Sequence, residues 1–342
     1  MQDIKELTLE ELKKALKNWG ADEFRARQIF AWIYKKGAGD FMQMSDLPLD
    51  LRERLKENFY LFGLKLIQAF KSHDGTKKFL FALKDANSIE AVTIPTEKRI
   101  TGCISTQAGC KFKCSFCASG ALGFKRNLTS AEMLEEILFL KNNSPQKKTT
   151  HIVFMGIGEP LDNYINVMKA IRIINSRLGL NIGARRITIS TNGIIPGIKR
   201  LSQEDLQIEL SISLHAADEK TRARIMPINK IYPLKDLIST CREYIRKTNR
   251  QITFEYILIK GVNSDLQNAR KLSTILKDLN CKVNLIPANT IKEYKIEPPK
   301  HSEVLVFKNL LLKQGINVTL RKPRGQDIEA ACGQLRLRYE EE

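Results

Sequence analysis

The chain has 342 residues, 43% hydrophobic and 27% charged, a composition typical of a soluble globular protein with one large and one smaller domain. No apolar run approaches the roughly 20 residues that a membrane helix needs, and no secretory signal opens the chain, so we expect a cytoplasmic protein with no membrane partner. The net charge of +18 favours a polyanionic partner, although general lysine richness of the source genome would give the same excess.

Residues 1–62 are predicted to form a small, basic helical domain. A capping box from Thr8 to Glu11 opens an amphipathic helix that stops at Gly20. A second helix is expected over about residues 23–36, and a third near residues 49–59. The basic residues here fit an RNA-docking domain, and they fit a merely solvated outer face about equally well.

Residues 63–99 change to the two-residue period that is typical of β-strands. Strands are expected over residues 64–71 and 78–83, joined into a hairpin by the turn 73–76. A third strand, over residues 89–94, ends at Pro95. We expect this β extension to join the helical domain to the rest of the chain.

Strands and helices alternate from residue 100 to about residue 320. Strands are predicted over residues 101–107, 151–155, 186–191, 208–214, 252–258 and 282–286, and helices over residues 130–141, 164–177, 234–247, 266–279 and 301–314. Apolar strands that are separated by crossover helices form a parallel sheet. The pattern therefore predicts an α/β fold, an open, partial (β/α)6 barrel of the TIM type, followed by a C-terminal segment over residues 321–342.

Three cysteines with the spacing C-x3-C-x2-C stand at Cys110, Cys114 and Cys117. They can converge on one soft metal centre without completing a four-ligand shell. A [4Fe–4S] cluster held this way has an open iron, which can chelate S-adenosylmethionine and pass an electron to its sulfonium. The alternatives are a zinc site or free buried cysteines, but zinc needs a fourth ligand and the closest downstream histidine is His151. The triplet resembles the signature of the radical S-adenosylmethionine superfamily, which uses the partial-barrel fold.

Glycines and short polar residues follow the predicted strands, at the edge where parallel barrels carry their chemistry. The Gly158-Glu159 step resembles the one with which this superfamily binds the amino group of S-adenosylmethionine. The other candidate cofactor-binding residues are Ser190, Ser213, Leu214, His215 and Asn289. Taken singly, each polar residue is more simply a helix cap or a turn residue, but their coincidence at one edge favours a binding site.

Four longer stretches narrow the resemblance to one family. They are residues 103–110, 155–160, 224–229 and 321–335, the last containing Ala-Ala-Cys-Gly-Gln-Leu. Together they resemble the RlmN family of dual-specificity RNA methyltransferases over essentially the whole chain. The resemblance implies methylation of C2 of one adenine in 23S rRNA and of the adenine beside the tRNA anticodon. It also implies a [4Fe–4S] cluster, S-adenosylmethionine and an electron donor such as flavodoxin, and we expect a monomer.

The family mechanism implies roles for three residues outside the cysteine triplet. Cys332 takes a methyl group from one S-adenosylmethionine, and a radical made from a second molecule activates that methyl so that it adds to C2. Glu90 accepts the C2 proton, and Cys103 attacks the sulfur of Cys332, which leaves a transient Cys103–Cys332 disulfide. Without the resemblance, both cysteines would be interpreted as buried structural residues and Glu90 as a solvent-facing acid.

Two other functions stay open from the sequence alone. The related Cfr family methylates C8 of the same ribosomal adenine, confers antibiotic resistance and shares the cysteines. Pro160, Asn192 and the intact run 321–325 resemble RlmN more than Cfr. A non-catalytic zinc- and RNA-binding protein would use the basic surface alone.

Overall fold

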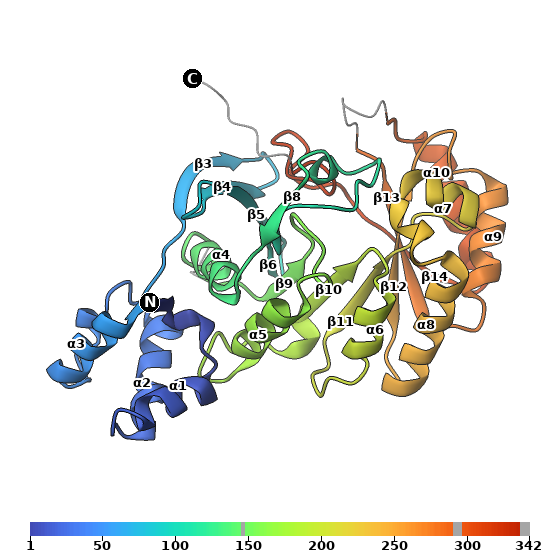
Figure 1. The fold of residues 1–342 in the computed structure, drawn as a ribbon. Helices are drawn as coiled ribbons and strands as arrows, with labels where there is room; N and C mark the ends of the chain where they lie inside the picture. The colour runs from blue at the N-terminus through green and yellow to red at the C-terminus, as the bar shows by residue number, and fades with distance from the viewer. Residues whose placement is uncertain (145–147, 290–295, 336–342) are drawn as a thin grey trace.

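The computed structural model describes residues 1–144, 148–289 and 296–335. A ten-stranded sheet runs through the molecule in the order β14-β13-β12-β11-β10-β9-β6-β5-β4-β3. Figure 1 shows helices α5 to α10 arranged around the strands of one half, with α1 to α3 as a separate group beside the N-terminus. In the part of the chain described, no helix has the length and apolar character needed to cross a membrane.

The N-terminal group consists of three short helices, α1 (Leu9–Lys17), α2 (Glu23–Ala31) and α3 (Leu49–Asn58), and a parallel pair of two-residue strands, β1 (Gln2–Asp3) and β2 (Phe59–Tyr60). The predicted capping box is present, because Thr8 Oγ1 accepts from Glu11 N–H (3.3 Å) and Glu11 Oε2 accepts from Thr8 N–H (2.7 Å). A buried ion pair between Lys5 and Glu135 (2.9 Å) ties this group to helix α4.

The predicted β extension is an antiparallel sheet of β3 (Lys65–Lys71), β4 (Lys77–Ala82) and β5 (Ser88–Pro95). Strand β5 also pairs antiparallel with β6, so the extension continues the barrel sheet at one edge. Phe79 and Phe81 on β4 pack edge-on against Phe139 of α4. Their ring centroids lie 5.2 Å and 4.8 Å, respectively, from the centroid of the Phe139 ring. Since side chains alternate along a strand, the residues between them face the opposite side.

The other half of the sheet is entirely parallel, as predicted. Its strands are β6 (Ile100–Cys103), β9 (His151–Phe154), β10 (Ile187–Thr191), β11 (Glu209–Ser213), β12 (Ile252–Leu258), β13 (Cys281–Pro287) and β14 (Asn317–Leu320). The helices are α4 (Ser130–Asn142), α5 (Tyr164–Asn175), α6 (Ile195–Leu201), α7 (Glu219–Ile225), α8 (Leu234–Thr248), α9 (Leu266–Leu276) and α10 (His301–Lys313). Strand β14 is an addition that the sequence analysis does not predict.

The predicted first strand, residues 101–107, is in fact two pieces. Strand β6 stops at Cys103, and β7 (Gln107–Gly109) pairs antiparallel with β8 (Phe124–Asn127) in a separate ribbon. Side chains replace the sheet partners between the pieces: Ser105 N–H donates to Glu136 Oε2 (3.0 Å), and Ser105 Oγ donates to Glu90 O (2.7 Å). The ribbon carries the three cysteines of the triplet away from the sheet and over its end.

Candidate active site

The cysteine loop, residues 110–117, lies between β7 and β8. Gly109 has φ +77°, and a Cβ at this position would stand 1.7 Å from Gly123 O, so the crossing of the two strands requires glycine. Cys110 N–H donates to the same carbonyl oxygen (3.1 Å). The loop thereby places Cys110, Cys114 and Cys117 around one cavity, which we call the cofactor cavity.

The three thiols of the loop suit an iron–sulfur cluster. Burial raises the pKa of Cys110 to about 12 and the pKa of Cys114 well above its ordinary value, so a metal would have to displace thiol protons. Phe112 and Phe116 line the cavity with them and provide an apolar sheath. Within residues 1–144, 148–289 and 296–335, no three His, Cys, Asp or Glu side chains already form a metal-binding group, so the ligand role stays a prediction.

The fold brings His215, a predicted cofactor-binding residue, into the cofactor cavity. It lies there with the three loop cysteines, although it is far from them in the sequence. Its Nδ1 accepts from Ile257 N–H (3.0 Å), and its ring packs edge-on against Phe116 at 4.6 Å. Burial, followed by the charge of Arg222, lowers the pKa of His215 to about 3, so the imidazole is neutral and Nε2 carries its proton. A protonated Nε2 is a hydrogen-bond donor and a poor metal ligand, which weakens the zinc alternative.

Glu159 follows β9 and is almost fully buried in the same cavity. Its Oε2 accepts from Asn192 N–H (2.7 Å) and its Oε1 from Leu161 N–H (3.0 Å). Burial raises the pKa of Glu159 to about 7, and these two hydrogen bonds oppose the effect. Gly158, at φ +105°, lets the backbone pass close to Gln107, where a Cβ would approach to 2.6 Å. The carboxyl group is thus fixed in direction and has lone pairs left for a ligand.

The remaining predicted cofactor-binding residues do not all line this cavity. Ser190 and Ser213 do, from the ends of neighbouring strands β10 and β11. Leu214 does not, because its side chain is buried and its N–H donates to Glu255 O (3.1 Å). Asn289 lies at the adjoining pocket, where its Nδ2 donates to Cys332 O (3.0 Å).

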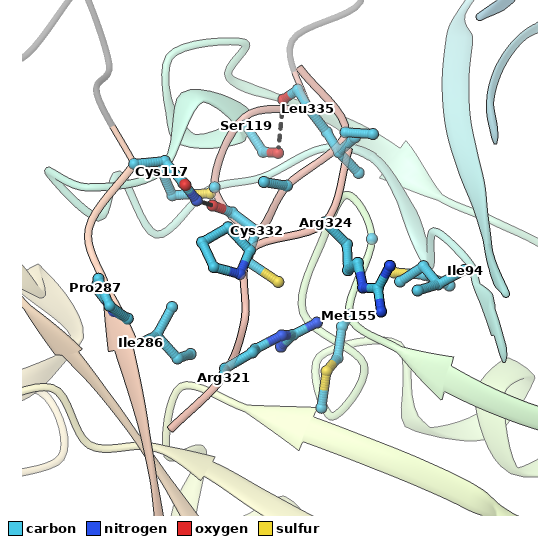
Figure 2. A pocket seen from close by; sticks show the side chains of 17 residues that line it. Ile94, Cys117, Ser119, Met155, Ile286, Pro287, Arg321, Arg324, Cys332 and Leu335 are labelled. Atoms are coloured by element: carbon cyan, nitrogen blue, oxygen red, sulfur yellow. Dashed lines mark hydrogen bonds between the residues drawn. The ribbon is translucent and has the colours of Figure 1, made fainter. Parts of the chain in front are cut away.

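Cys103 and Cys332 line a second pocket, which we call the thiol pocket (Figure 2). It adjoins the cofactor cavity, and Cys117, Arg321 and Cys332 line both. All cysteines are free thiols, so the implied Cys103–Cys332 disulfide is not formed in this structure. Burial and the neighbouring Cys332 raise the pKa of Cys103 to about 12, whereas Arg321 acts in the opposite direction.

Arg321 directly follows β14, and Figure 2 shows its side chain extending toward Met155 and Cys332. The charge of Cys332 raises the pKa of Arg321, and Glu255 and Cys103 add to this. At Cys103 the guanidinium opposes the effect of burial without overcoming it, because the pKa of this thiol is still raised to about 12. The sequence placed Arg321 in a family motif but indicated no role for it.

The C-terminal segment that carries Cys332, residues 325–335, is fastened at both ends. On one side, Ser72 Oγ in the turn of the β extension donates to Asp327 Oδ1 (2.6 Å). On the other side, Ala118 N–H, next to the cysteine loop, donates to Gly333 O (2.7 Å). Cys332 is therefore held between the β extension and the cysteine loop.

Glu90 lies on β5 and is fully buried, so a solvent-facing position is excluded. It lines neither cavity, but it shares a strand face with Val92, which packs against Cys103 in a small apolar cluster. Its Oε1 is 3.2 Å from Lys78 Nζ, and both side chains are shielded from water. Glu90 therefore lies near the thiol pocket but does not line it, whereas Cys103, which packs against the neighbouring Val92, does.

Arg222 is a buried residue that nothing in the sequence singles out, because it stands in a short helix with other cations. Its Nη2 donates to Asn192 O (2.7 Å), its Nε to Leu214 O (3.2 Å) and its Nη1 to Asn229 Oδ1 (3.0 Å). These bonds tie the loops after β10 and β11 together, and so fix the edge of the cofactor cavity.

Comparison with known proteins agrees with this geometry. Residues 104–272 match the model of the radical SAM superfamily, and residues 2–61 match the ribosomal RNA large subunit methyltransferase N-terminal domain. The probable dual-specificity RNA methyltransferase RlmN of Caldanaerobacter subterraneus is 47% identical over 340 residues, 99% of each chain. That of Clostridium acetobutylicum is 48% identical over 343 residues, covering 100% of this chain and 99% of the relative. The crystal structure of a radical SAM methyltransferase from Sphaerobacter thermophilus matches with a TM-score of 0.95 and 41% identity, covering 99% of this chain and 100% of that one.

The partial barrel with its cysteine loop is the architecture of the radical S-adenosylmethionine enzymes. Within that class, the identity over the full length decides the family: the chain belongs to the RlmN family of dual-specificity RNA methyltransferases. This membership sets aside the non-catalytic zinc-binding interpretation.

Proposed function

We propose that this protein methylates C2 of one adenine in 23S rRNA and C2 of the adenine beside the tRNA anticodon, with Cys332 as the methyl carrier. The observation that carries the proposal is the thiol pocket, in which Cys103 and Cys332 stand together beside the cavity of the three loop cysteines. A methyl transfer directly from sulfonium to base would need no such pair. The names of the relatives support RNA as the substrate.

The cofactor cavity fits its expected contents. Cys110, Cys114 and Cys117 would hold a [4Fe–4S] cluster, and the lining residues proposed to bind S-adenosylmethionine are Gly158, Glu159, Ser190, Ser213, His215 and Asn289. Leu214, also predicted from the sequence, lies outside both linings. When bound, the two cofactors supply the one-electron chemistry that an electron-poor ring carbon requires. Glu159 would accept from the ammonium group, and neutral His215 would donate through Nε2.

The thiol-side residues divide the work of carrying and releasing the methyl group. Cys332 forms an S–CH3 bond while the donor sulfonium loses its methyl, beside the cation of Arg321. Glu90 then takes the C2 proton from the RNA that is bound through carbon to Cys332, and the unpaired electron of this adduct passes to a one-electron acceptor. The thiolate of Cys103 forms the S–S bond with Cys332 as the C–S bond breaks, and the released carbon keeps the electron pair and takes a proton.

The N-terminal residues 1–62 would dock the RNA. Cation–aromatic pairs with one exposed and one partly buried member occur there, with Arg25 4.5 Å from the Phe24 ring and Lys36 3.5 Å from the Trp32 ring. Such pairs suit phosphates and unstacked bases together. We assign residues 63–99 to the β extension, 100–320 to the barrel and 321–342 to the methyl-carrying segment, and propose a monomer that receives electrons from a flavodoxin-type donor.

The decisive test is the product. Protein reconstituted without oxygen would be incubated with S-adenosylmethionine, a reductant, and either an rRNA fragment or tRNA. Nucleoside mass spectrometry against 2-methyl- and 8-methyladenosine standards should find 2-methyladenosine in both RNAs. An 8-methyl product would move the protein to the chemistry of Cfr, and no methylated adenosine from protein with a competent cluster would overturn the proposal.

A further inference from the structure

The β extension buries an ion pair that stability alone does not explain. Lys78 on β4 and Glu90 on β5 are 2% and 0% exposed, and Lys78 Nζ lies 3.2 Å from Glu90 Oε1. Lysine is almost never fully buried without a partner. The free-energy cost of removing two charges from water offsets most of their attraction, so a buried pair contributes little net stability.

The ion pair lies on the face of the extension that turns toward the thiol pocket. Phe79, next to Lys78 on β4, packs on Phe139 of α4, so Lys78 points to the other side of the sheet. On that side Val92, which is opposite Lys78 in the β4–β5 register, packs against Cys103. The pair is therefore a second layer directly behind the side chains that line the thiol pocket.

The charges around Glu90 leave Lys78 as its immediate counterion. On α4, Glu136 accepts from the N–H of Ser105, and burial raises the pKa of Glu136 well above its ordinary value. On β6 the titratable group is the thiol of Cys103, and the three residues of β7 carry none. Across the thiol pocket stand Arg321, Arg324 and Cys332, which line that pocket whereas Glu90 does not.

We propose that Lys78 is a positioning residue for the deprotonation step, keeping Glu90 ionised and directed so that it can accept the C2 proton. The inference rests on the proposed function, which makes Glu90 the proton acceptor. Burial alone favours the neutral carboxylic acid, which cannot accept a proton, whereas an ammonium group within hydrogen-bonding distance favours the carboxylate. In the step itself the C2–H bond breaks, its electron pair stays on the base, and the proton goes to Glu90.

The test measures the release of RNA from its covalent link to the protein as a function of pH, in single-turnover reactions of the full-length enzyme. We expect K78M to shift the acidic limb of the pH–rate profile for RNA release upward by about one pH unit. At a fixed pH on the rising part of this limb, the shift is a roughly tenfold loss of rate. K78R keeps the positive charge and should keep the limb in place. K78Q serves as a second neutral variant if K78M does not fold.

Lys5 provides a matched control, because it is also 2% exposed and pairs with Glu135 at 2.9 Å. K5M loses an ion pair of a buried lysine with a partly buried glutamate and does not touch the thiol pocket, so it reports the effect of lost stability and should leave the pH profile unchanged. A second measurement does not need the loaded enzyme: infrared difference spectra against E90Q should show a protonated carboxyl band near neutral pH in K78M but not in the wild type.

E90Q separates the two levels of the proposal. If E90Q releases RNA at the wild-type rate, Glu90 is not the proton acceptor and the assignment in the proposed function fails. If E90Q traps the RNA while K78M and K78Q keep the wild-type acidic limb, Glu90 keeps its role and the role of Lys78 is overturned. A limb that moves equally in K78R and K78M would also contradict the charge argument.

Discussion

The two pockets of the candidate site are built in different ways. In the parallel half, the residues around the cofactor cavity come from the ends of consecutive strands, with Glu159 after β9, Ser190 on β10 and Ser213 on β11. The thiol pocket joins pieces that are far apart in the chain, Cys103 on β6 and Cys332 in the C-terminal segment. These residues of the cofactor cavity thus come together because the ends of parallel strands lie at one edge of the sheet. The residues of the thiol pocket come together through packing between distant parts of the chain.

The two sides are also held in different ways. Arg222, fully buried, binds three oxygen acceptors from the loops that surround the cofactor cavity. The segment of Cys332 is held by several hydrogen bonds from separate parts of the chain: Asp327 accepts from Ser72 and His73, Cys332 O from Asn289, and Gly333 O from Ala118. The difference teaches that one buried cation can hold the edge of the barrel together, whereas the thiol side needs separate bonds to distant segments.

The largest expected effect comes from removing the methyl carrier. Cys332→Ala should reduce methylated RNA to background while S-adenosylmethionine still binds, because the substitution removes one sulfur from the wall of the cofactor cavity and leaves the three loop cysteines, Glu159 and His215 in place. Nucleoside mass spectrometry and equilibrium dialysis would measure the two quantities. Cys281→Ala, which removes a buried free thiol on β13, is the control and should remain active. Methylation by Cys332→Ala would place the methyl transfer on the cofactor side alone.

The loss of the second thiol should stop the cycle later. Cys103→Ala should still attach RNA but not release it, so a covalent protein–RNA species accumulates. Denaturing gels with labelled RNA would show it, and Cys241→Ala, at a buried cysteine of α8, should not. Free methylated RNA at the wild-type rate from Cys103→Ala would contradict the resolving role.

In the parallel half, Arg222→Met should destabilise the fold by about 3–5 kcal/mol, since buried acceptors lose their charged donor. The free energy of unfolding in urea measures this. Arg172→Met is the control, because Arg172 is about half exposed and its ion pair with Glu204 is a surface pair worth at most about 1 kcal/mol. If the two variants cost the same, the barrel edge is not held as described.

The smallest effect concerns Glu136 at the border of the two halves. The pKa of Glu136 is raised in the folded state, so this carboxyl group ionises at a lower pH in the unfolded chain than in the folded protein. The free energy of unfolding therefore falls as pH rises above the ordinary pKa of 4.5. Each pH unit of displacement is worth about 1.4 kcal/mol. Glu136→Gln should therefore gain stability over the wild type at pH 8 but not near pH 4, by urea unfolding. An equal difference at both values would contradict the ionisation argument.

The sequence predicted most of the fold and part of the site. The alternation of strands and helices predicted the parallel half of the sheet, and the two-residue period over residues 63–99 predicted the β extension. The break after Cys103 could not be predicted, because it depends on bonds from Ser105 to distant Glu136 and Glu90. Likewise, Lys78 and Arg222 look like surface cations in the sequence, since burial of a charge depends on partners that only the fold supplies.

The hydrogen bond between Ala118 and Gly333 joins the cysteine loop to the methyl-carrying segment through their backbones. The bond therefore couples the order of the loop to the order of the segment, and the coupling free energy is the same in both directions. On the proposed function, a cluster held by the three loop thiols would also help to seat Cys332, so cluster binding and methyl acceptance would be linked.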